Sequence, residues 1–144
     1  GTSKQPLPHG KGLILLVEDQ KDILKLCRQI LEDSGYNVLA ATSPKEAIQL
    51  AEYYKDKIEL LVTDVIMPVM NGSDLFKKLQ LVCSDLKVLY MSGYTADFIA
   101  QNLCIDEGIN VIEKPFSIAK LTKAVAKTLK AGKSHNHIHT GEKT

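Results

Sequence analysis

Short apolar runs alternate with amphipathic segments along most of this chain, and this alternation restricts the fold more than any other feature. Turns that contain glycine, proline or charged residues separate the runs, which cover residues 13–17, 37–41, 60–63, 87–91 and 110–112. Apolar runs of this length predict buried strands. Strands that alternate with helices form parallel sheets covered on both faces. The sequence therefore predicts an α/β fold with a doubly wound, five-stranded parallel sheet.

Helical spacing of apolar residues fills the segments between the predicted strands. The expected helices lie near residues 23–31, 47–54, 75–82, 95–103 and 118–129, the fourth being the weakest pattern. Local signals mark several helix ends. Ser43, Pro44 and Glu46 are typical of a capping box with proline in the first turn, Ser117 is expected to cap the last helix, and Gly35 follows the first helix.

One domain accounts for the length of 144 residues, 44% of them hydrophobic. Residues 1–12 contain prolines and glycines and are interpreted as a linker, residues 13–130 as the folded domain, and residues 131–144 as a flexible tail. No apolar stretch approaches the ~20 residues of a membrane span. We therefore expect no direct contact of this domain with a membrane.

Net charge and cysteine content bear on the expected binding partners and on the expected cellular compartment. Eighteen basic and 17 acidic residues give a formal net charge of +1, so no overall field favours nucleic acid. Cys27, Cys83 and Cys104 are odd in number and include no C-x-x-C pair, which argues against a disulfide framework or a zinc site. A cytoplasmic location is expected.

Carboxylates follow the first and third predicted strands: Glu18 and Asp19 after one, Asp64 after the other. In the expected flavodoxin-like strand order 2-1-3-4-5, the order reverses between strands one and three, and ligands bind at the carboxyl ends of the strands there. Crowded carboxylates repel one another until a cation offsets their charge. Mg²⁺ prefers oxygen ligands and commonly joins protein carboxylates to a phosphate. The sequence predicts a Mg²⁺ site that also receives a phosphoryl group.

A hydroxyl and an ammonium are expected at the same edge of the sheet. Ser92 and Lys114 come at the ends of the fourth and fifth predicted strands. An ammonium stabilises charge on phosphoryl oxygens, and a carboxylate can act as the nucleophile that forms an acyl phosphate. Taken alone, Ser92 is more readily explained as a helix cap and Lys114 as a solvated strand end, but their coincidence with the acids favours a site.

Four motifs occur in the order and register of one protein family. They are Glu18-Asp19, Asp64 followed by Met67-Pro68 and Gly72, Met91-Ser92-Gly93, and Lys114-Pro115-Phe116. With them, residues 13–130 resemble the receiver domain of two-component response regulators, the CheY-like family. The resemblance implies partners, namely a histidine kinase or a histidine phosphotransfer protein, and a homodimer through the face of the fourth helix, fifth strand and fifth helix.

The resemblance also implies a role for each site residue. Asp64 would accept a phosphoryl group from phosphohistidine in a reaction that the domain itself assists, and Lys114 would contact the phosphoryl oxygens. Ser92 would be the switch hydroxyl. The peptide bond between Lys114 and Pro115 would be cis. The Mg²⁺ ligands would be Glu18, Asp19, Asp64 and the backbone carbonyl of Ile66.

Two further features refine the resemblance. Val111 stands three residues before Lys114, where the family usually has Tyr or Phe, so the familiar aromatic switch is absent. Residues 91–97 resemble receivers at the carboxyl end of hybrid sensor histidine kinases. With no output domain following and a linker-like segment in front, a hybrid kinase is the expected parent, and a stand-alone response regulator is the alternative.

Two other classes of protein are alternatives to a receiver domain. A phosphatase of the haloacid dehalogenase type also uses a nucleophilic Asp at a strand end, but it has a second Asp two residues later, where this chain has Ile66. A pseudo-receiver would bind a partner without being phosphorylated. The complete set of acids, hydroxyl and lysine argues against it.

Overall fold

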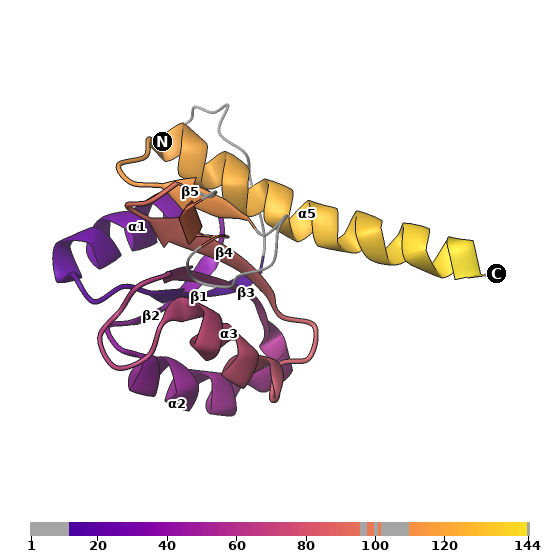
Figure 1. Cartoon of the computed structure of the whole chain (residues 1–144), viewed down its shortest axis with the longest axis horizontal. Coiled ribbons are helices and arrows are strands. Elements are labelled where there is room, and N and C mark those ends of the chain that lie inside the picture. The colour runs from indigo at the N-terminus through magenta and orange to yellow at the C-terminus, as the bar shows by residue number, and fades with distance from the viewer. Residues whose placement is uncertain (1–11, 96–97, 100, 102–109, 144) are drawn as a thin grey trace.

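A five-stranded parallel sheet forms the centre of the computed structural model, which describes residues 12–95, 98, 99, 101 and 110–143, with side chains through residue 130 (Figure 1). The strand order is β2-β1-β3-β4-β5. The strands are β1 (Leu13–Val17), β2 (Asn37–Ala41), β3 (Ile58–Asp64), β4 (Lys87–Ser92) and β5 (Val111–Glu113). The predicted fold class and strand order are therefore confirmed.

Pairing between strands explains the small differences from the predicted strand ends. β3 begins at Ile58 rather than residue 60, because Ile58 pairs with Leu13 of β1. β4 reaches Ser92, which pairs with Glu113 of β5. Periodicity of a single segment cannot show these extensions, since they depend on the length of the neighbouring strand.

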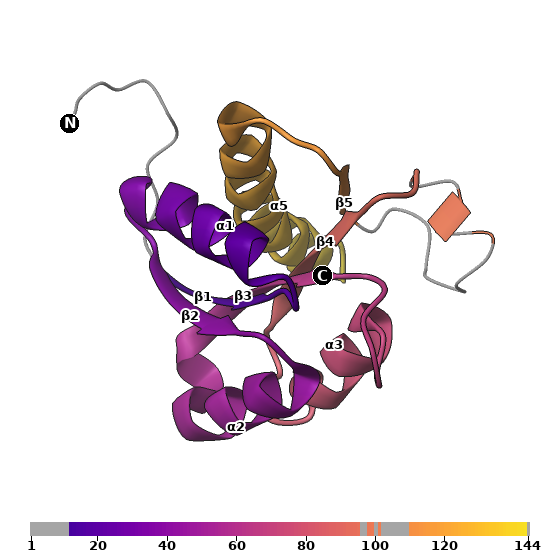
Figure 2. The same cartoon turned by 90° about the vertical axis from the view of Figure 1, so that its left-hand side faces the viewer.

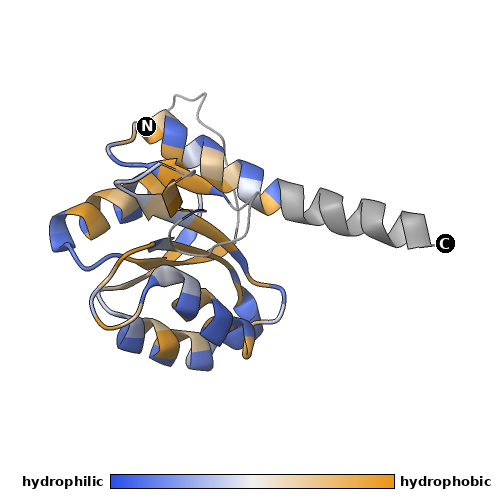
Figure 3. Cartoon of the chain, in the orientation of Figure 1, coloured by the Kyte–Doolittle hydropathy of each residue, from blue (hydrophilic) through white to orange (hydrophobic). Residues whose placement is uncertain are grey.

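Helices cover both faces of the sheet, as Figures 1 and 2 show. α1 (Lys21–Asp33) and α5 (Ile118–Lys143) lie on one face, and α2 (Pro44–Tyr54) and α3 (Gly72–Gln80) lie on the other. Along β1, Ile14 and Leu16 pack toward α1 and α5, whereas Leu15 and Val17 pack toward α2 and α3. This alternation follows from the two-residue period of a strand. Apolar strands thus lie between helices whose outer faces are hydrophilic (Figure 3).

Helix ends agree with the capping signals. Ser43 Oγ accepts a hydrogen bond from the Glu46 N–H at 3.2 Å, and Glu46 Oε1 accepts one from the Thr42 N–H at 2.8 Å, one residue earlier than the usual capping box. Ser117 Oγ accepts from the Lys120 N–H at 3.1 Å, and Gly35 has φ 101°. A short 3-10 turn, Lys55–Lys57, follows α2.

The backbone of α5 includes residues 131–143 of the expected tail, and the flexibility of that tail stays a prediction. α5 continues through Lys143 and extends beyond the sheet (Figure 1), so the domain limit at residue 130 stays a prediction. The expected helix at residues 95–103 lies largely outside the described residues. None of the helices in the described part of the chain combines the length and apolarity that crossing a bilayer requires.

The cap of α2 supports a first prediction. Ser43→Ala removes the acceptor for the Glu46 N–H, so the free energy of unfolding should fall by about 1 kcal/mol. Urea unfolding measures the change. Ser43→Asp keeps an acceptor and should stay near the original stability, and an unchanged Ser43→Ala protein would contradict the assigned cap.

Candidate functional site

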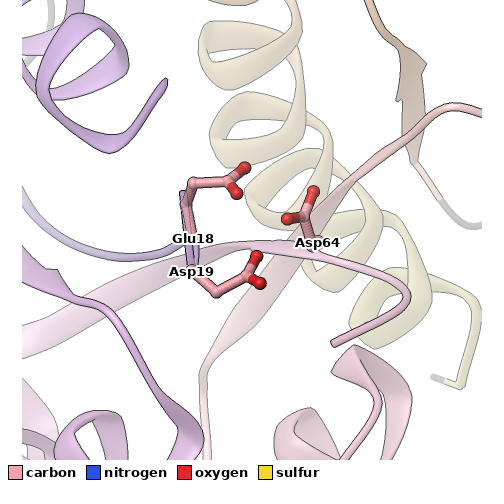
Figure 4. Close-up of side chains that lie close together, drawn as sticks. All are labelled: Glu18, Asp19 and Asp64. Atoms are coloured by element: carbon pink, nitrogen blue, oxygen red, sulfur yellow. The ribbon is translucent and has the colours of Figure 1, made fainter. Parts of the chain in front are cut away.

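Three carboxylates meet at the carboxyl edge of the sheet, where β1 and β3 lie side by side. Glu18 and Asp19 directly follow β1, and Asp64 is the last residue of β3. Carboxylate oxygens of the three residues lie within 4.8 Å of one another, and Figure 4 shows the side chains converging from the two strands. Glu18 is fully buried, Asp64 is buried and Asp19 is exposed. The acidic cluster predicted from the sequence is therefore present.

Lys114 joins this cluster from the segment after β5. Its Nζ lies 2.7 Å from Asp64 Oδ1 and 2.9 Å from Glu18 Oε1. Its backbone N–H donates to the Ser92 carbonyl at 2.7 Å, which ties the end of β5 to the end of β4. The Lys114-Pro115 bond is cis, as predicted. One ammonium thus bridges two buried carboxylates that come from different strands.

Burial and the contacts between Lys114 and the two carboxylates shift the pKa values of these groups in opposite directions. Burial raises the pKa of Asp64 to about 7, and the neighbouring Glu18 adds to this rise, while Lys114 opposes it. For Glu18, burial is outweighed by hydrogen bonds from Lys114 and the Gln20 N–H, so its pKa is lowered. For Lys114, burial is outweighed by the two carboxylates, and its pKa is raised. Asp64 is therefore the carboxyl of this cluster whose pKa is moved toward neutral pH.

A hollow of about 210 Å³ opens beside the cluster and gives access to Asp64. Its walls come from the ends of β1, β3, β4 and β5, with Ile66, Ser92 and Lys114 among the lining residues. The Ser92 hydroxyl is buried and accepts a hydrogen bond from the Tyr94 N–H at 2.9 Å. Tyr94 is one of the residues that line the hollow, and its ring stacks on that of Phe98 at 4.6 Å between centroids.

Each site residue expected from the sequence lies at this edge. Ser92 and Lys114 line the hollow together with Asp64, and Ile66 lies on its wall with a half-exposed side chain. Val111 is partly buried and stands opposite Tyr90 in the sheet, a position that brings no aromatic ring to the β5 side of the site.

Two supporting residues were not found from the sequence. The Gln20 N–H donates to Glu18 Oε2 at 3.0 Å, and Thr63 Oγ1 donates to the Asp64 carbonyl at 3.0 Å. Both hold a site residue in place. Their side chains carry no distinctive chemistry, and the contacts depend on the backbone path, so the sequence offered no signal for either.

Comparison with known proteins agrees with this geometry. The chain matches the response regulator receiver domain family over residues 14–126. It is 34% identical over 120 residues to a sensor kinase CckA of Brucella abortus, an alignment that covers 83% of the chain and 13% of the relative. It is 32% identical over 127 residues to the response regulator SaeR of Staphylococcus aureus, covering 86% and 53% respectively.

Among solved structures, the receiver domain from the hybrid histidine kinase CckA matches with a TM-score of 0.70 and 33% identity, covering 82% of this chain and 99% of that one. The chain belongs to the response regulator receiver domain family. The chain spans 13% of the length of the sensor kinase CckA and about half of the length of the response regulator SaeR. Its role is that of a receiver in a two-component phosphorelay.

The raised pKa of Asp64 leads to a second prediction, for protein without divalent cations. Between the ordinary pKa of 3.8 and about 7, the folded state holds a proton that the unfolded state has lost. The free energy of unfolding should therefore decrease as the pH rises from 5 to 7, by at most about 1.4 kcal/mol per unit. Urea unfolding at several pH values measures this slope.

Asp64→Asn supplies the matched control for that slope, since an amide does not titrate. The lowered pKa of Glu18 stabilises the fold fully above its ordinary value of 4.5, and the raised pKa of Lys114 does so fully below its ordinary value of 10.5. Both contributions are therefore constant between pH 5 and 7 and add nothing to the slope. An equal slope in Asp64→Asn would show that another group is responsible.

Proposed function

We propose that Asp64 is the phosphoacceptor of this receiver and takes the phosphoryl group from a phosphohistidine. The observation that carries the proposal is the position of Asp64 at the wall of an open hollow, with the Lys114 Nζ 2.7 Å from one carboxylate oxygen. Asp19 and Ser92 line the same hollow. These residues supply a nucleophile, positive charge and a hydroxyl where a phosphoryl group would enter.

The proposed step is an exchange of one bond to phosphorus for another. A carboxylate oxygen of Asp64 attacks the phosphorus atom, the new O–P bond forms, and the N–P bond of phosphohistidine breaks. The electron pair of that bond returns to the imidazole nitrogen. The product is an acyl phosphate on Asp64. Transfers of this kind depend mainly on position and electrostatics, which a rigid sheet edge supplies.

Mg²⁺ fits the residues that are present. Three carboxylates within 4.8 Å carry more negative charge than the single ammonium beside them offsets, and all available ligands are oxygens. Glu18, Asp19, Asp64 and the backbone carbonyl of Ile66 would hold the ion, directly or through water. When bound, it would neutralise charge on the transferring phosphoryl oxygens.

Lys114 and Ser92 act on the product in this proposal. The Lys114 ammonium now bridges Glu18 and Asp64, and it would turn to the phosphoryl oxygens once these compete for it. The Ser92 hydroxyl, held by the Tyr94 N–H, would turn toward the same oxygens. Because the Tyr94 backbone would lose its partner, the loop after β4 would move, and this movement would be the signal.

The proposed phosphodonor is a histidine kinase or a histidine phosphotransfer protein, and the proposed parent is a hybrid sensor histidine kinase. Similarity to a sensor kinase at 34% identity and to the receiver of a hybrid histidine kinase at 33% supports this parent. We further propose that the domain is cytoplasmic and contacts neither nucleic acid nor a membrane. It would form a homodimer through the face made by the expected fourth helix, β5 and α5.

Phosphorylation of Asp64 supports a third prediction. Asp64→Asn removes the nucleophile while keeping the size of the side chain, so labelling by a ³²P-labelled phosphohistidine donor in Mg²⁺ should fall to background. Asp85→Asn, at an exposed acid in the loop between α3 and β4, should label like the unmodified protein. Normal labelling of Asp64→Asn would reject the assigned acceptor.

Lys114 supports a fourth prediction that separates ion binding from switching. Lys114→Ala removes the cation that pairs with Glu18 and Asp64, so Mg²⁺ should bind at least as tightly as before. Addition of beryllofluoride, an acyl phosphate mimic, should then give much smaller amide NMR shifts around Ser92. Lys78→Ala, on the exposed side of α3, serves as the control. If beryllofluoride gave the same shifts in Lys114→Ala as in the unmodified protein, the role proposed for Lys114 would be contradicted.

A further inference from the structure

The first residue of α3, Gly72, packs directly against the backbone of Asp64. A Cβ atom built on Gly72 would lie far inside van der Waals contact with the Asp64 carbonyl oxygen, 3.1 Å from Thr63 Cγ2 and 3.2 Å from the Asp64 carbonyl carbon. A backbone atom cannot turn aside as the end of a flexible side chain can. Any residue other than glycine at position 72 would therefore displace either the start of α3 or the peptide group of Asp64.

The same peptide group is restrained from other directions. Thr63 Oγ1 donates to the Asp64 carbonyl at 3.0 Å, and the following N–H, that of Val65, donates to the Met91 carbonyl of β4 at 3.0 Å. Gly72 also donates its N–H to the carbonyl of the next peptide, that of Val65, at 2.7 Å. The peptide that leaves Asp64 is thus held by β3, β4 and α3 together.

This contact also closes the loop that carries Ile66. The chain leaves the sheet after Asp64, and the hydrogen bond from Gly72 to Val65 joins the two ends of the loop. Inside it, the Met70 N–H donates to the Pro68 carbonyl at 2.8 Å, and Val69 has φ 75°, an uncommon conformation for a β-branched residue. The position of the Ile66 carbonyl therefore depends on where Gly72 and Asp64 meet.

We propose that Gly72 is a positioning residue for phosphoryl transfer: its missing side chain lets α3 approach Asp64 closely enough to fix the Asp64 carboxylate and the Ile66 carbonyl relative to Glu18 and Asp19. This inference rests on the proposed function of Asp64. A displacement of about 1 Å in a reacting group can reduce a rate about 100-fold, so close packing at this point has a large effect on the chemistry.

Space, and not backbone conformation, requires the glycine here. Gly12 and Gly35 have positive φ, whereas Gly72 lies in the first turn of a helix and is outside that group. Alanine favours a helix more than glycine does. By local preference alone, Gly72→Ala would strengthen α3, so a loss of function in this variant would come from the contact with Asp64.

The test compares Gly72→Ala with two controls in Mg²⁺ titrations followed by amide NMR and in labelling by a phosphohistidine donor at saturating Mg²⁺. Lys78→Ala places the same residue on the exposed side of the same helix, where it does not line the hollow. Leu79→Val removes a buried methylene from the same helix, at the end remote from Asp64, and lowers stability. We expect Gly72→Ala to bind Mg²⁺ at least tenfold more weakly and to label at least tenfold more slowly, and both controls to stay within about twofold.

A Gly72→Ala protein that binds Mg²⁺ and labels within twofold of the unmodified chain would overturn the proposal, and so would an equal loss in Leu79→Val. If Gly72→Ala does not fold, Thr63→Val tests the same peptide from its other side, because it removes the hydroxyl that donates to the Asp64 carbonyl. Severalfold weaker Mg²⁺ binding supports the proposal, and unchanged binding overturns it. Failure of the unmodified chain to label would instead reject the proposed function itself.

Discussion

The Lys114 ammonium, placed between the carboxylates of Glu18 and Asp64, is the interaction on which the site depends. Two acids with little or no solvent contact would repel each other strongly, and each would be expensive to bury alone. Lys114 offsets this at 2.7 and 2.9 Å, and it does so from the segment after β5, far along the chain from both acids. The pair of contacts therefore couples the ends of three strands, and the sheet edge acquires a fixed arrangement of charges.

In that arrangement, several cations compete for the same carboxylates. A proton, the Lys114 ammonium and, in the proposed function, Mg²⁺ all act on the same carboxylates. Burial and Glu18 raise the pKa of Asp64 to about 7, so a bound proton and a bound metal ion are alternatives near neutral pH. In the proposed function, the arrival of a phosphoryl group would change which partner the Lys114 ammonium contacts.

Two segments lie beside the charged residues, one after β3 and one after β4. The loop after β3 is fixed by Gly72 against the Asp64 backbone, and it carries the Ile66 carbonyl. The segment after β4 is held by the hydrogen bond from the Tyr94 N–H to Ser92, with the Tyr94 and Phe98 rings stacked beside the hollow. Val111 on β5 supplies no aromatic ring, whereas Tyr94, two residues after Ser92, supplies one from this segment. In the proposed function, the loop after β3 positions Asp64, and the segment after β4 is the part that moves.

The sequence by itself determined the fold class and the residues of the acidic site, because apolar periodicity sets strands and helices locally and polar residues at strand ends share one edge of a parallel sheet. The strand order was expected from the flavodoxin-like arrangement and not from any local pattern. The helix caps at Ser43 and Ser117 could also be predicted from the sequence, since each hydrogen bond joins residues within four positions of each other. Tertiary structure alone decided the close approach of Gly72 to Asp64, the start of β3, the end of β4, and the raised pKa of Asp64. These depend on distances between segments remote in the chain and on burial, which no local pattern contains.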